Sequence, residues 1–320
     1  MIVTVTPNPS LDRTVELPYL QRGEVHRATS VRLDPGGKGV NVARALTAAG
    51  LDTIAVLPSG RAPGGRLTGL LDVHQVRAAT VAISGATRTN TTLVEPDGTT
   101  TKINEPGPVL TGAEVAELVE TVSALAAGAS WIVSCGSLTA GMPEDFHAGI
   151  VRRGRRAGAR VAVDTSDAPL RVACTAGPDL IKPNHEELAE LVGRPLVSLG
   201  DVLDAAREVR AAGVGAVLVS LGEGGALLVE PPGVHGGGEY HALSSPIAVR
   251  STVGAGDATL AGFLAAGGTG PDALRHAVAY GAAACRLPGS AMPGPHEIDL
   301  HDVRVVSHPD ETLHLTGAAV

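Results

Sequence analysis

The residues with the clearest chemical meaning lie in Ser251–Gly262, which reads Ser-Thr-Val-Gly-Ala-Gly-Asp-Ala-Thr-Leu-Ala-Gly. A β-branched run (Ile247, Val249) precedes it and predicts a strand, glycines turn the chain, and an Ala- and Leu-rich helical pattern follows. A glycine turn that opens a helix aims several backbone N–H groups at one point, where an anion is favoured. Asp257, in the first helical turn, could take a proton from a hydroxyl that attacks a phosphate. Taken alone, an ordinary helix start with an acidic first turn explains the pattern better.

A second glycine-rich segment, Gly36-Gly37-Lys38-Gly39-Val40-Asn41, also opens a predicted helix. Its glycines permit close approach of a ligand to the backbone, and Lys38 and Asn41 lie one helical turn apart on the same side. A helix start with an exposed lysine is the alternative explanation. Gly39 stands where a P-loop needs Ser or Thr, and the sequence contains no GxGxxG, which argues against the P-loop and Rossmann classes.

Four shorter motifs carry polar groups suited to phosphate. In Thr87-Arg88-Thr89-Asn90, the guanidinium of Arg88 and the amide of Asn90 share a strand face, although a solvated strand face explains the motif better when it is taken alone. Another of these motifs is Lys182-Pro183-Asn184-His185-Glu186-Glu187, in which Asn184 and Glu187 have the spacing of a capping box. The same two side chains could lie near a hydrated Mg²⁺ and its phosphates, and the two interpretations are compatible. The remaining two motifs are Cys135-Gly136-Ser137-Leu138 and Ser220-Leu221-Gly222-x-x-Gly225, in which glycines follow a predicted strand.

The elements that must position these groups alternate between strand and helix. From Thr111 onward helices and short β-branched strands follow one another, which predicts a parallel sheet covered on both faces. Between Thr80 and Asn104 the pattern changes to Thr-rich alternation around a Pro-Asp-Gly turn, which predicts a β-hairpin. We expect this hairpin and the strands near residues 13–33 to form a small sheet over one end of the main domain. Pro231–Gly238 is predicted to be a loop.

Composition narrows the class of protein. The length of 320 residues suits one large α/β domain, and a formal charge of −8 predicts no nucleic-acid partner. No apolar run approaches the ~18 residues that cross a bilayer, and the N-terminus reads as a strand rather than a signal peptide, so we expect no membrane partner. Three widely spaced cysteines without a CxxC pattern predict reduced thiols in a cytoplasmic protein.

The combined order of the motifs is more specific than any one of them. Thr6-Pro7-Asn8-Pro9-Ser10-Leu11-Asp12, Gly-Gly-Lys-Gly-x-Asn, Thr-Arg-x-Asn, Gly-Ser-Leu, Lys-Pro-Asn-x-x-Glu, Ser-Leu-Gly-x-x-Gly and Thr-Val-Gly-Ala-Gly-Asp follow one another. Together they resemble the PfkB (ribokinase-like) sugar kinases, most closely the hexose-phosphate branch that contains the 1-phosphofructokinases. The resemblance implies a three-layer α/β sandwich with a central, mostly parallel sheet and a small β lid. It places the main domain at residues 1–12, 36–86 and 105–320 and the lid at residues 13–35 and 87–104.

The resemblance also implies roles for individual residues. Asp257 matches the catalytic base, and Gly254, Ala255 and Gly256 match the anion hole. The sugar and its own phosphate are assigned to Asp12, Arg27, Gly37, Lys38, Asn41, Arg88, Asn90 and Ser137. The ATP side is assigned to Lys182, Asn184, Glu187, Ser220, Gly222, Gly225 and Thr252, with Asn184 and Glu187 near Mg²⁺ through water.

The implied activity is ATP-dependent phosphorylation of a ketohexose phosphate, with D-fructose 1-phosphate giving fructose 1,6-bisphosphate as the main expectation. Tagatose 6-phosphate and fructose 6-phosphate are alternative substrates within the family. A non-catalytic sensor of sugar phosphate or nucleotide is the alternative from another class, and the intact Asp257 and glycine turn weigh against it. The expected cofactors are ATP and Mg²⁺, with a monovalent cation as a further expectation, and the expected assembly is a homodimer through the lid.

Overall fold

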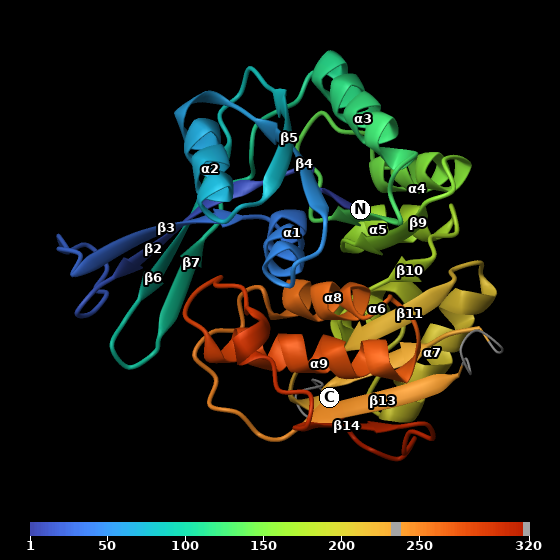
Figure 1. Ribbon diagram of the computed structural model, residues 1–320. Coiled ribbons are helices and arrows are strands. Elements are labelled where there is room, and N and C mark those ends of the chain that lie inside the picture. The colour runs from blue at the N-terminus through green and yellow to red at the C-terminus, as the bar shows by residue number, and fades with distance from the viewer. Residues whose placement is uncertain (232–237, 316–320) are drawn as a thin grey trace.

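A ten-stranded sheet forms the centre of the molecule in the computed structural model of the protein, which describes residues 1–231 and 238–315 (Figure 1). In spatial order the strands are β14 (Val303–Val306), β13 (Glu239–Ser244), β12 (Ala226–Val229), β11 (Ala216–Ser220), β10 (Leu180–Ile181), β9 (Arg160–Asp164), β8 (Trp131–Cys135), β1 (Ile2–Val5), β4 (Thr53–Ser59) and β5 (Arg77–Ala82). The strands from β5 to β11 pair in parallel, and β12, β13 and β14 continue the sheet in antiparallel fashion.

Helices cover both faces of this sheet, as the alternation of helix and strand predicts. One face carries α1, α2, α8 and α9, and the other carries α3 to α7. Strand β1 shows how one strand serves two cores, because Val3 and Val5 pack with one helix layer and Ile2 with the other. The helices are α1 (Lys38–Ala48), α2 (Arg61–Val73), α3 (Gly112–Ala126), α4 (Phe146–Arg156), α5 (Asp167–Cys174), α6 (His185–Val192), α7 (Leu199–Ala211), α8 (Ala255–Ala265) and α9 (Gly270–Arg286), with 3₁₀ turns η1 (Gly222–Gly224) and η2 (Pro295–Glu297).

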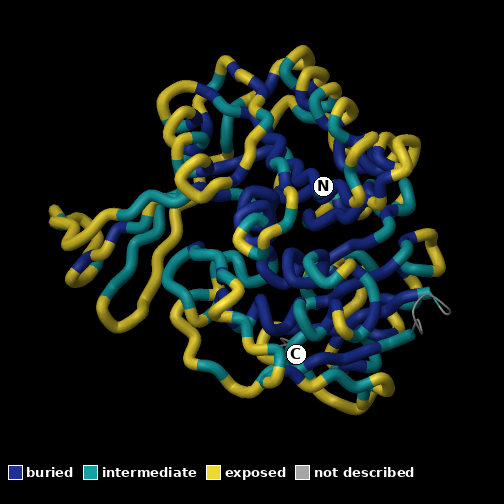
Figure 2. The backbone as a smooth tube through the Cα atoms, viewed as in Figure 1, coloured by how far each residue is buried: buried dark blue, intermediate teal, exposed yellow. Residues whose placement is uncertain are grey.

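A second, four-stranded sheet projects from the edge of the body near α1 and α2, and we call it the lid (Figure 1). Its strands, in spatial order, are β3 (Ser30–Gly36), β2 (Ser10–Glu16), β6 (Arg88–Val94) and β7 (Thr100–Ile103). Figure 2 shows that most of the lid is exposed or half-buried, in contrast to the dark-blue central strands. The fold class predicted from the sequence, a mostly parallel α/β sandwich with a small β-sheet lid, is therefore confirmed.

Two local expectations differ from the structure, and one helix was not predicted. The Thr-rich hairpin pattern starts later than Thr80, because β5 pairs in parallel with β4 at the edge of the main sheet, within the range 36–86 that the resemblance gives to the main domain. No strand enters the glycine turn at Ile247 and Val249, since β13 ends at Ser244 and these two apolar side chains line a cavity instead. Helix α5 carries a proline in a short apolar segment and was not predicted.

The loop predicted at Pro231–Gly238 falls largely on residues 232–237, which lie outside the described residues. Within residues 1–231 and 238–315, none of the helices has both the length and the apolar character needed to cross a membrane.

Candidate active site

Asp257 lies in the first turn of α8, which begins directly after the glycine turn. Gly254 has a φ of 79°, a left-handed conformation that glycine adopts without strain, and a Cβ built there would lie 2.5 Å from Met292 Cε. The backbone of the turn therefore favours glycine, whereas the flexible end of Met292 could move aside for a Cβ. Asp257 is 7% exposed. In the same turn the Ala255 N–H donates to the Thr252 carbonyl at 3.3 Å, and Ala255 and Gly256 line a cavity.

The carboxylate of Asp257 accepts a hydrogen bond from helix α1. Asn41 Nδ2 donates to Asp257 Oδ2 at 2.9 Å, across 216 positions of the sequence. Burial raises the pKa of Asp257 to about 6, and the nearby charge of Asp164 adds to the effect. The hydrogen bond from Asn41 and the charges of Lys38 and Lys182 act in the opposite direction. A pKa near 6 suits a general base, which must be ionised at neutral pH and still accept a proton readily.

Two lysines from different elements meet on Asp164, at the end of strand β9. Lys38 Nζ lies 2.8 Å from Asp164 Oδ1, and Lys182 Nζ lies 3.2 Å from Oδ2. Lys38 Nζ also lies 3.8 Å from Glu187 Oε1. Burial acts to raise the pKa of the fully buried Asp164, but the charges of Lys182 and Lys38 outweigh it and hold that pKa below its usual value. The carboxylate of Asp164 thus fixes both ammonium groups beside the glycine turn, where a Cβ at Gly256 would lie 3.2 Å from Lys182 Nζ.

The lid contributes a further carboxylate, the half-buried Asp12 on β2. Its Oδ1 accepts hydrogen bonds from Ser10 Oγ at 2.7 Å and from Asn90 Nδ2 at 3.1 Å. The parallel pairing of β2 with β6 sets Asp12 opposite Asn90, as the shared strand face of the Thr-Arg-x-Asn motif requires. Burial raises the pKa of Asp12, while the bonds from Ser10 and Asn90 act against that rise. Asp12 can therefore accept hydrogen bonds from hydroxyl groups at the base of the lid.

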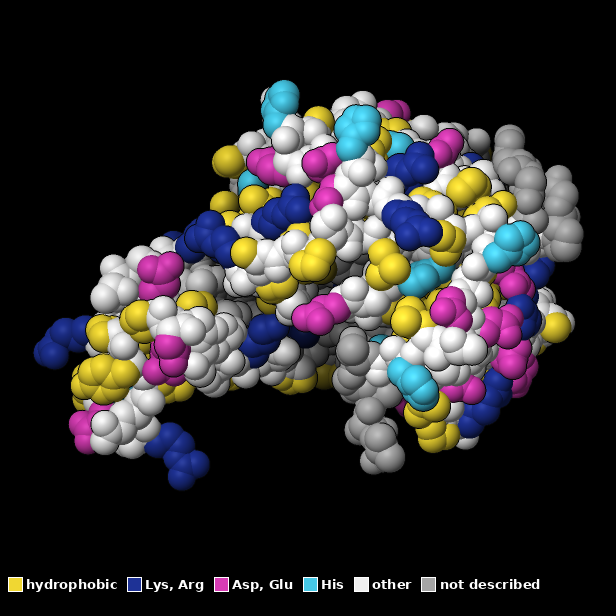
Figure 3. Space-filling model, turned by 90° about the horizontal axis from the view of Figure 1, so that it is seen from below, with side chains coloured by type: hydrophobic (Ala, Val, Ile, Leu, Met, Phe, Trp, Pro, Cys, Tyr) yellow, Lys and Arg dark blue, Asp and Glu magenta, His cyan; other side chains and the backbone are white. Residues whose placement is uncertain are grey.

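Arg88 begins β6 and closes the region between the lid and the main sheet. Its Nη2 donates to the Asn8 carbonyl at 3.0 Å, and its Nη1 donates to the Glu105 carbonyl at 3.1 Å. The side chain of Asn8 in turn lies 3.3 Å from Ser137 Oγ, which brings the loop after β8 next to this corner. Seen from below, the surface is hollowed between the lid and the main body, and Lys or Arg side chains lie in the recess (Figure 3).

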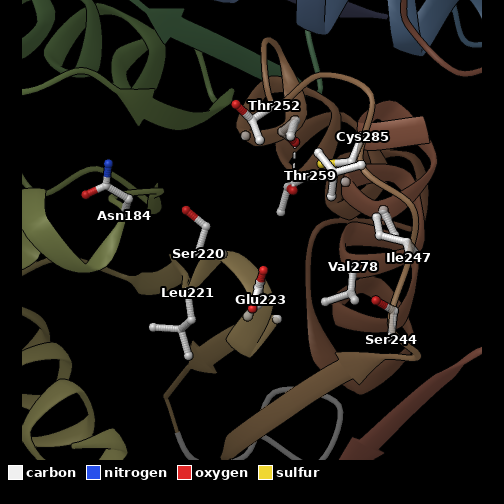
Figure 4. Close-up of a pocket in the computed structure, with 18 of the residues that line it drawn as sticks. Asn184, Ser220, Leu221, Glu223, Ser244, Ile247, Thr252, Thr259, Val278 and Cys285 are labelled. Atoms are coloured by element: carbon white, nitrogen blue, oxygen red, sulfur yellow. Dashed lines mark hydrogen bonds between the residues drawn. The ribbon is translucent and has the colours of Figure 1, made fainter. Parts of the chain in front are cut away.

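A cavity of about 1040 Å³ adjoins the glycine turn on the side away from the lid. Figure 4 shows Asn184 and Ser220 on one side of it and Ile247 and Val278 on the other, with Thr252 near one end. Gly222 and Gly225, which have φ angles of 60° and 76°, lie in its wall together with Ala255 and Gly256. Apolar walls at one end and a helix N-terminus at the other suit a ligand with a flat base and an anionic tail.

The capping box predicted at the start of α6 is present. Asn184 Oδ1 accepts a hydrogen bond from the Glu187 N–H at 2.7 Å, and Glu187 Oε2 accepts one from the Asn184 N–H at 2.9 Å. The box leaves Glu187 Oε1 directed toward Lys38 and leaves the Asn184 side chain in the cavity wall. The structural reading of this motif is therefore confirmed, and its functional reading stays a prediction.

The structure brings most of the predicted site residues into one continuous region and leaves one of them apart. Arg27 is exposed in the segment between β2 and β3, which forms the outer end of the lid (Figure 1). Lys38 lies beside Asp164 and Glu187, and so toward the cavity side of the glycine turn rather than beside Arg88.

Sequence reasoning missed two buried charged residues, Asp164 and Arg44. Asp164 ends a buried parallel strand, a position where ligands commonly meet such sheets, and that signal was available. Arg44 lies among Ala, Val and Leu in α1, and only its charge within an apolar stretch marks it. No cluster of three or more His, Cys, Asp or Glu side chains suited to a metal occurs in the part of the chain that the structure describes.

Comparison with known proteins places the chain in a family. Residues 6–297 match the pfkB family of carbohydrate kinases, to which the chain therefore belongs, and it is a phosphotransferase of the sugar kinase type. It is 38% identical over 309 residues to a 1-phosphofructokinase of Rhodobacter capsulatus, covering 93% of this chain and 94% of that relative. It is 35% identical over 297 residues to the ATP-dependent 6-phosphofructokinase isozyme 2 of Escherichia coli, covering 91% and 94%. The structure of phosphofructokinase-2 from Escherichia coli in complex with potassium superposes with a TM-score of 0.86 at 34% identity, covering 92% and 96%.

Proposed function

We propose that this protein transfers the terminal phosphoryl group of ATP to D-fructose 1-phosphate, giving D-fructose 1,6-bisphosphate and ADP. The observation that carries the proposal is the buried Asp257 carboxylate, which lies beside the N–H groups of a glycine turn at the edge of the large cavity. The similarity to the 1-phosphofructokinase of Rhodobacter capsulatus supports the choice of substrate.

In the proposed reaction, Asp257 takes the proton from the C6 hydroxyl of the sugar while the oxygen of that hydroxyl attacks the γ-phosphorus of ATP. The bond between that phosphorus and the β–γ bridging oxygen breaks, and ADP leaves with the bonding electrons. Backbone N–H groups at Gly254, Ala255 and Gly256 stabilise the charge on the transferred group. Lys182, held by Asp164, adds a fixed positive charge next to Gly256. Positioning and charge stabilisation then supply most of the acceleration.

We propose that the sugar lies at the base of the lid. Asp12, Asn90, Gly37 and Asn41 are assigned to its hydroxyl groups, which the half-buried carboxylate of Asp12 supports. Arg27, exposed at the outer end of the lid, and Lys38, held by Asp164 and Glu187, lie apart from the corner at Arg88 and are not assigned to the phosphate of the sugar. Arg88 and Ser137 are assigned to its 1-phosphate. The adjoining positions of Arg88, Asn8 and Ser137 support this assignment.

ATP is assigned to the large cavity, with Thr252, Asn184, Ser220, Gly222, Gly225 and Lys182 along its phosphate and base path. Glu187 Oε1 is not used by the capping box, and together with Asn184 it suits a hydrated Mg²⁺ better than a closed cage of ligands. Bound Mg²⁺ would neutralise charge on the β- and γ-phosphates. A monovalent cation is a further proposal, supported by the potassium complex of the Escherichia coli relative.

We further propose a cytoplasmic homodimer that associates through the lid. Three free cysteines support the compartment, because reduced thiols are usual there. Apolar side chains exposed on the lid support the association, since Tyr19 is 58% exposed, Val31 51% and Ile103 56%.

A coupled ADP-release assay tests the substrate. The protein is assayed with Mg²⁺ and ATP against D-fructose 1-phosphate, fructose 6-phosphate, tagatose 6-phosphate and ribose. The highest kcat/KM is expected for D-fructose 1-phosphate. If kcat/KM is highest for either 6-phosphate, the proposed substrate is wrong but the substrate is still a phosphosugar. If kcat/KM is highest for ribose, a phosphosugar substrate is rejected. Absence of turnover with all four, together with ligand-induced thermal shifts, would support a sensor.

A further inference from the structure

Arg44 is a buried arginine at the centre of the site that no step above uses. It lies on α1, one turn after Asn41, and is 6% exposed. Its Nη1 lies 3.2 Å from the Pro35 carbonyl, 3.2 Å from Asn41 Oδ1 and 3.0 Å from the Ser290 carbonyl. The side chain therefore connects the end of lid strand β3, the loop after α9 and the amide that contacts Asp257.

The contacts of Asn41 fix which way its amide points. A guanidinium group only donates hydrogen bonds, so the atom of Asn41 that faces Arg44 must be the oxygen. The amide nitrogen then faces Asp257 Oδ2, where an ionised carboxylate only accepts. Rotating the amide by half a turn would set its NH₂ against the guanidinium and its oxygen against the carboxylate. Arg44 and ionised Asp257 thus select one and the same orientation.

The surroundings of Arg44 indicate that the residue is retained for more than stability. Its Nε is buried and lacks a hydrogen-bond partner among the described residues, which is costly for a charged group. The carboxylates of Asp34 and Asp12 balance its charge through space, whereas Arg32 opposes it. An apolar side chain of similar length would fill this position in α1 without that cost.

We propose that Arg44 is a positioning residue for the phosphoryl transfer: it locks the Asn41 amide so that Asp257 keeps a hydrogen-bond donor on Oδ2. This inference rests on the proposed function, because it assigns a role toward the proposed base. Without Arg44 the amide can turn its oxygen toward Asp257, and the carboxylate loses a contact that favours its ionised form. The acidic limb of the pH–rate profile then moves to higher pH, and the carboxylate is held less firmly toward the hydroxyl.

A double-mutant cycle tests the inference with Arg44→Met, Asn41→Ala and the double variant. In Arg44→Met we expect the acidic limb of kcat/KM to rise by at least about half a pH unit and kcat at pH 6.5 to fall about tenfold. In the Asn41→Ala background the same substitution should change kcat less than about twofold, because the amide through which Arg44 acts is gone. Equal effects in both backgrounds, or an unmoved limb, would overturn the inference.

Arg210→Met is the matched control. Arg210 is a partly buried arginine on α7 whose Nε donates to the Gly215 carbonyl, and we expect its loss to leave the pH profile unchanged. Arg44→Lys, which keeps a charge and donors, should move the limb less than Arg44→Met. If circular dichroism shows that Arg44→Met does not fold, the cycle is run with Arg44→Gln, whose own amide can rotate and release Asn41.

A failure of the proposed role of Arg44 can be told apart from a failure of the proposed function. If Asp257→Asn retains the activity of the parent, the proposed base is wrong irrespective of Arg44. If Asp257→Asn is inactive and the cycle is additive, only the role of Arg44 is wrong.

Discussion

Asp257 and Asp164 illustrate how burial and neighbours give two carboxylates of one site opposite properties. Both side chains are buried, yet burial and the charge of Asp164 raise the pKa of Asp257 to about 6, while Lys182 and Lys38 hold the pKa of Asp164 below its usual value. Asp164 therefore stays ionised as an anchor for the two lysines. Asp257 is left as the group that can exchange a proton near neutral pH.

Replacement of Asp257 tests the residue on which the chemistry depends. Asp257→Asn keeps the shape and a hydrogen-bond acceptor but removes the base, so kcat should fall by about 10²–10⁴-fold with little change in the KM for ATP. Steady-state ADP release at pH 7.5 measures the loss. A kcat within tenfold of the parent would mean that another group takes the proton.

The raised pKa of Asp257 predicts the pH dependence of the reaction. The base must be ionised to act, so activity is present above its pKa and is lost as the pH falls through about 6. Below that value kcat/KM should fall by about tenfold per pH unit. A profile from pH 5 to 8.5 with D-fructose 1-phosphate measures this limb. A profile flat down to pH 5 would contradict the assignment.

At the scale of elements, β2 pairs with β3 so that Gly36 lies opposite Ser10, two residues before Asp12, and the Asp12 carboxylate extends over Gly36. A Cβ at Gly36 would lie 2.2 Å from Asp12 Oδ2 and 2.6 Å from Oδ1, although the backbone of Gly36 itself is not left-handed. Glycine is thus required by the carboxylate that faces the sugar region. The motif Gly-Gly-Lys-Gly-x-Asn therefore does three things: it leaves space for Asp12, it begins α1, and it places the side chains of Lys38 and Asn41 on the first turn of that helix.

Gly36→Ala is predicted to displace Asp12 and weaken sugar binding selectively. The KM for the phosphosugar should rise about tenfold or more, as expected when a charge-assisted hydrogen bond is lost, while the KM for ATP stays within about twofold. The matched control is Gly65→Ala on α2, where a Cβ meets nothing within 4 Å. That control should leave both constants unchanged and stabilise the helix slightly. Equal changes in the two variants would contradict the role of Gly36.

The sequence predicts features that depend on neighbouring residues better than features that depend on contacts between distant segments. Capping boxes, glycine turns and the order of the helices are local, and the box at Asn184–Glu187 was predicted from spacing alone. The pattern alone extended the hairpin back to Thr80 because the polar alternation at the end of β5 resembles that of the lid, and the pairing with β4 decides the place of that strand. The contacts of Asp257 with Asn41 and of Asp164 with Lys38 and Lys182 join distant segments, which no single-sequence pattern encodes.

At the scale of the whole molecule, the lid carries apolar side chains on the face opposite Asp12. Leu11, Val31 and Leu33 lie around a shallow hollow of about 510 Å³ that also reaches the start of α2. Exposed apolar surface on a sheet that projects from the body is typical of an interface between subunits.

Val31→Asp is predicted to weaken the proposed dimer. An ionised carboxylate in an apolar contact costs several kcal/mol, so the protein should shift from dimer to monomer at micromolar concentration. Sedimentation or light scattering measures the mass. The matched control is Val73→Asp, since Val73 is 75% exposed at the end of α2 and outside the lid, and its mass should not change. A monomeric parent would reject the proposed assembly.

The connection between the lid and α1 has a consequence for motion. Strand β3 ends at Gly36 and α1 begins at Lys38, so one residue, Gly37 with its left-handed φ of 109°, joins the two. A change in the angle of the lid would therefore bend the chain at this glycine, directly before the helix that carries Lys38 and Asn41. We expect a reporter dye at the outer end of the lid to change its signal when the sugar binds.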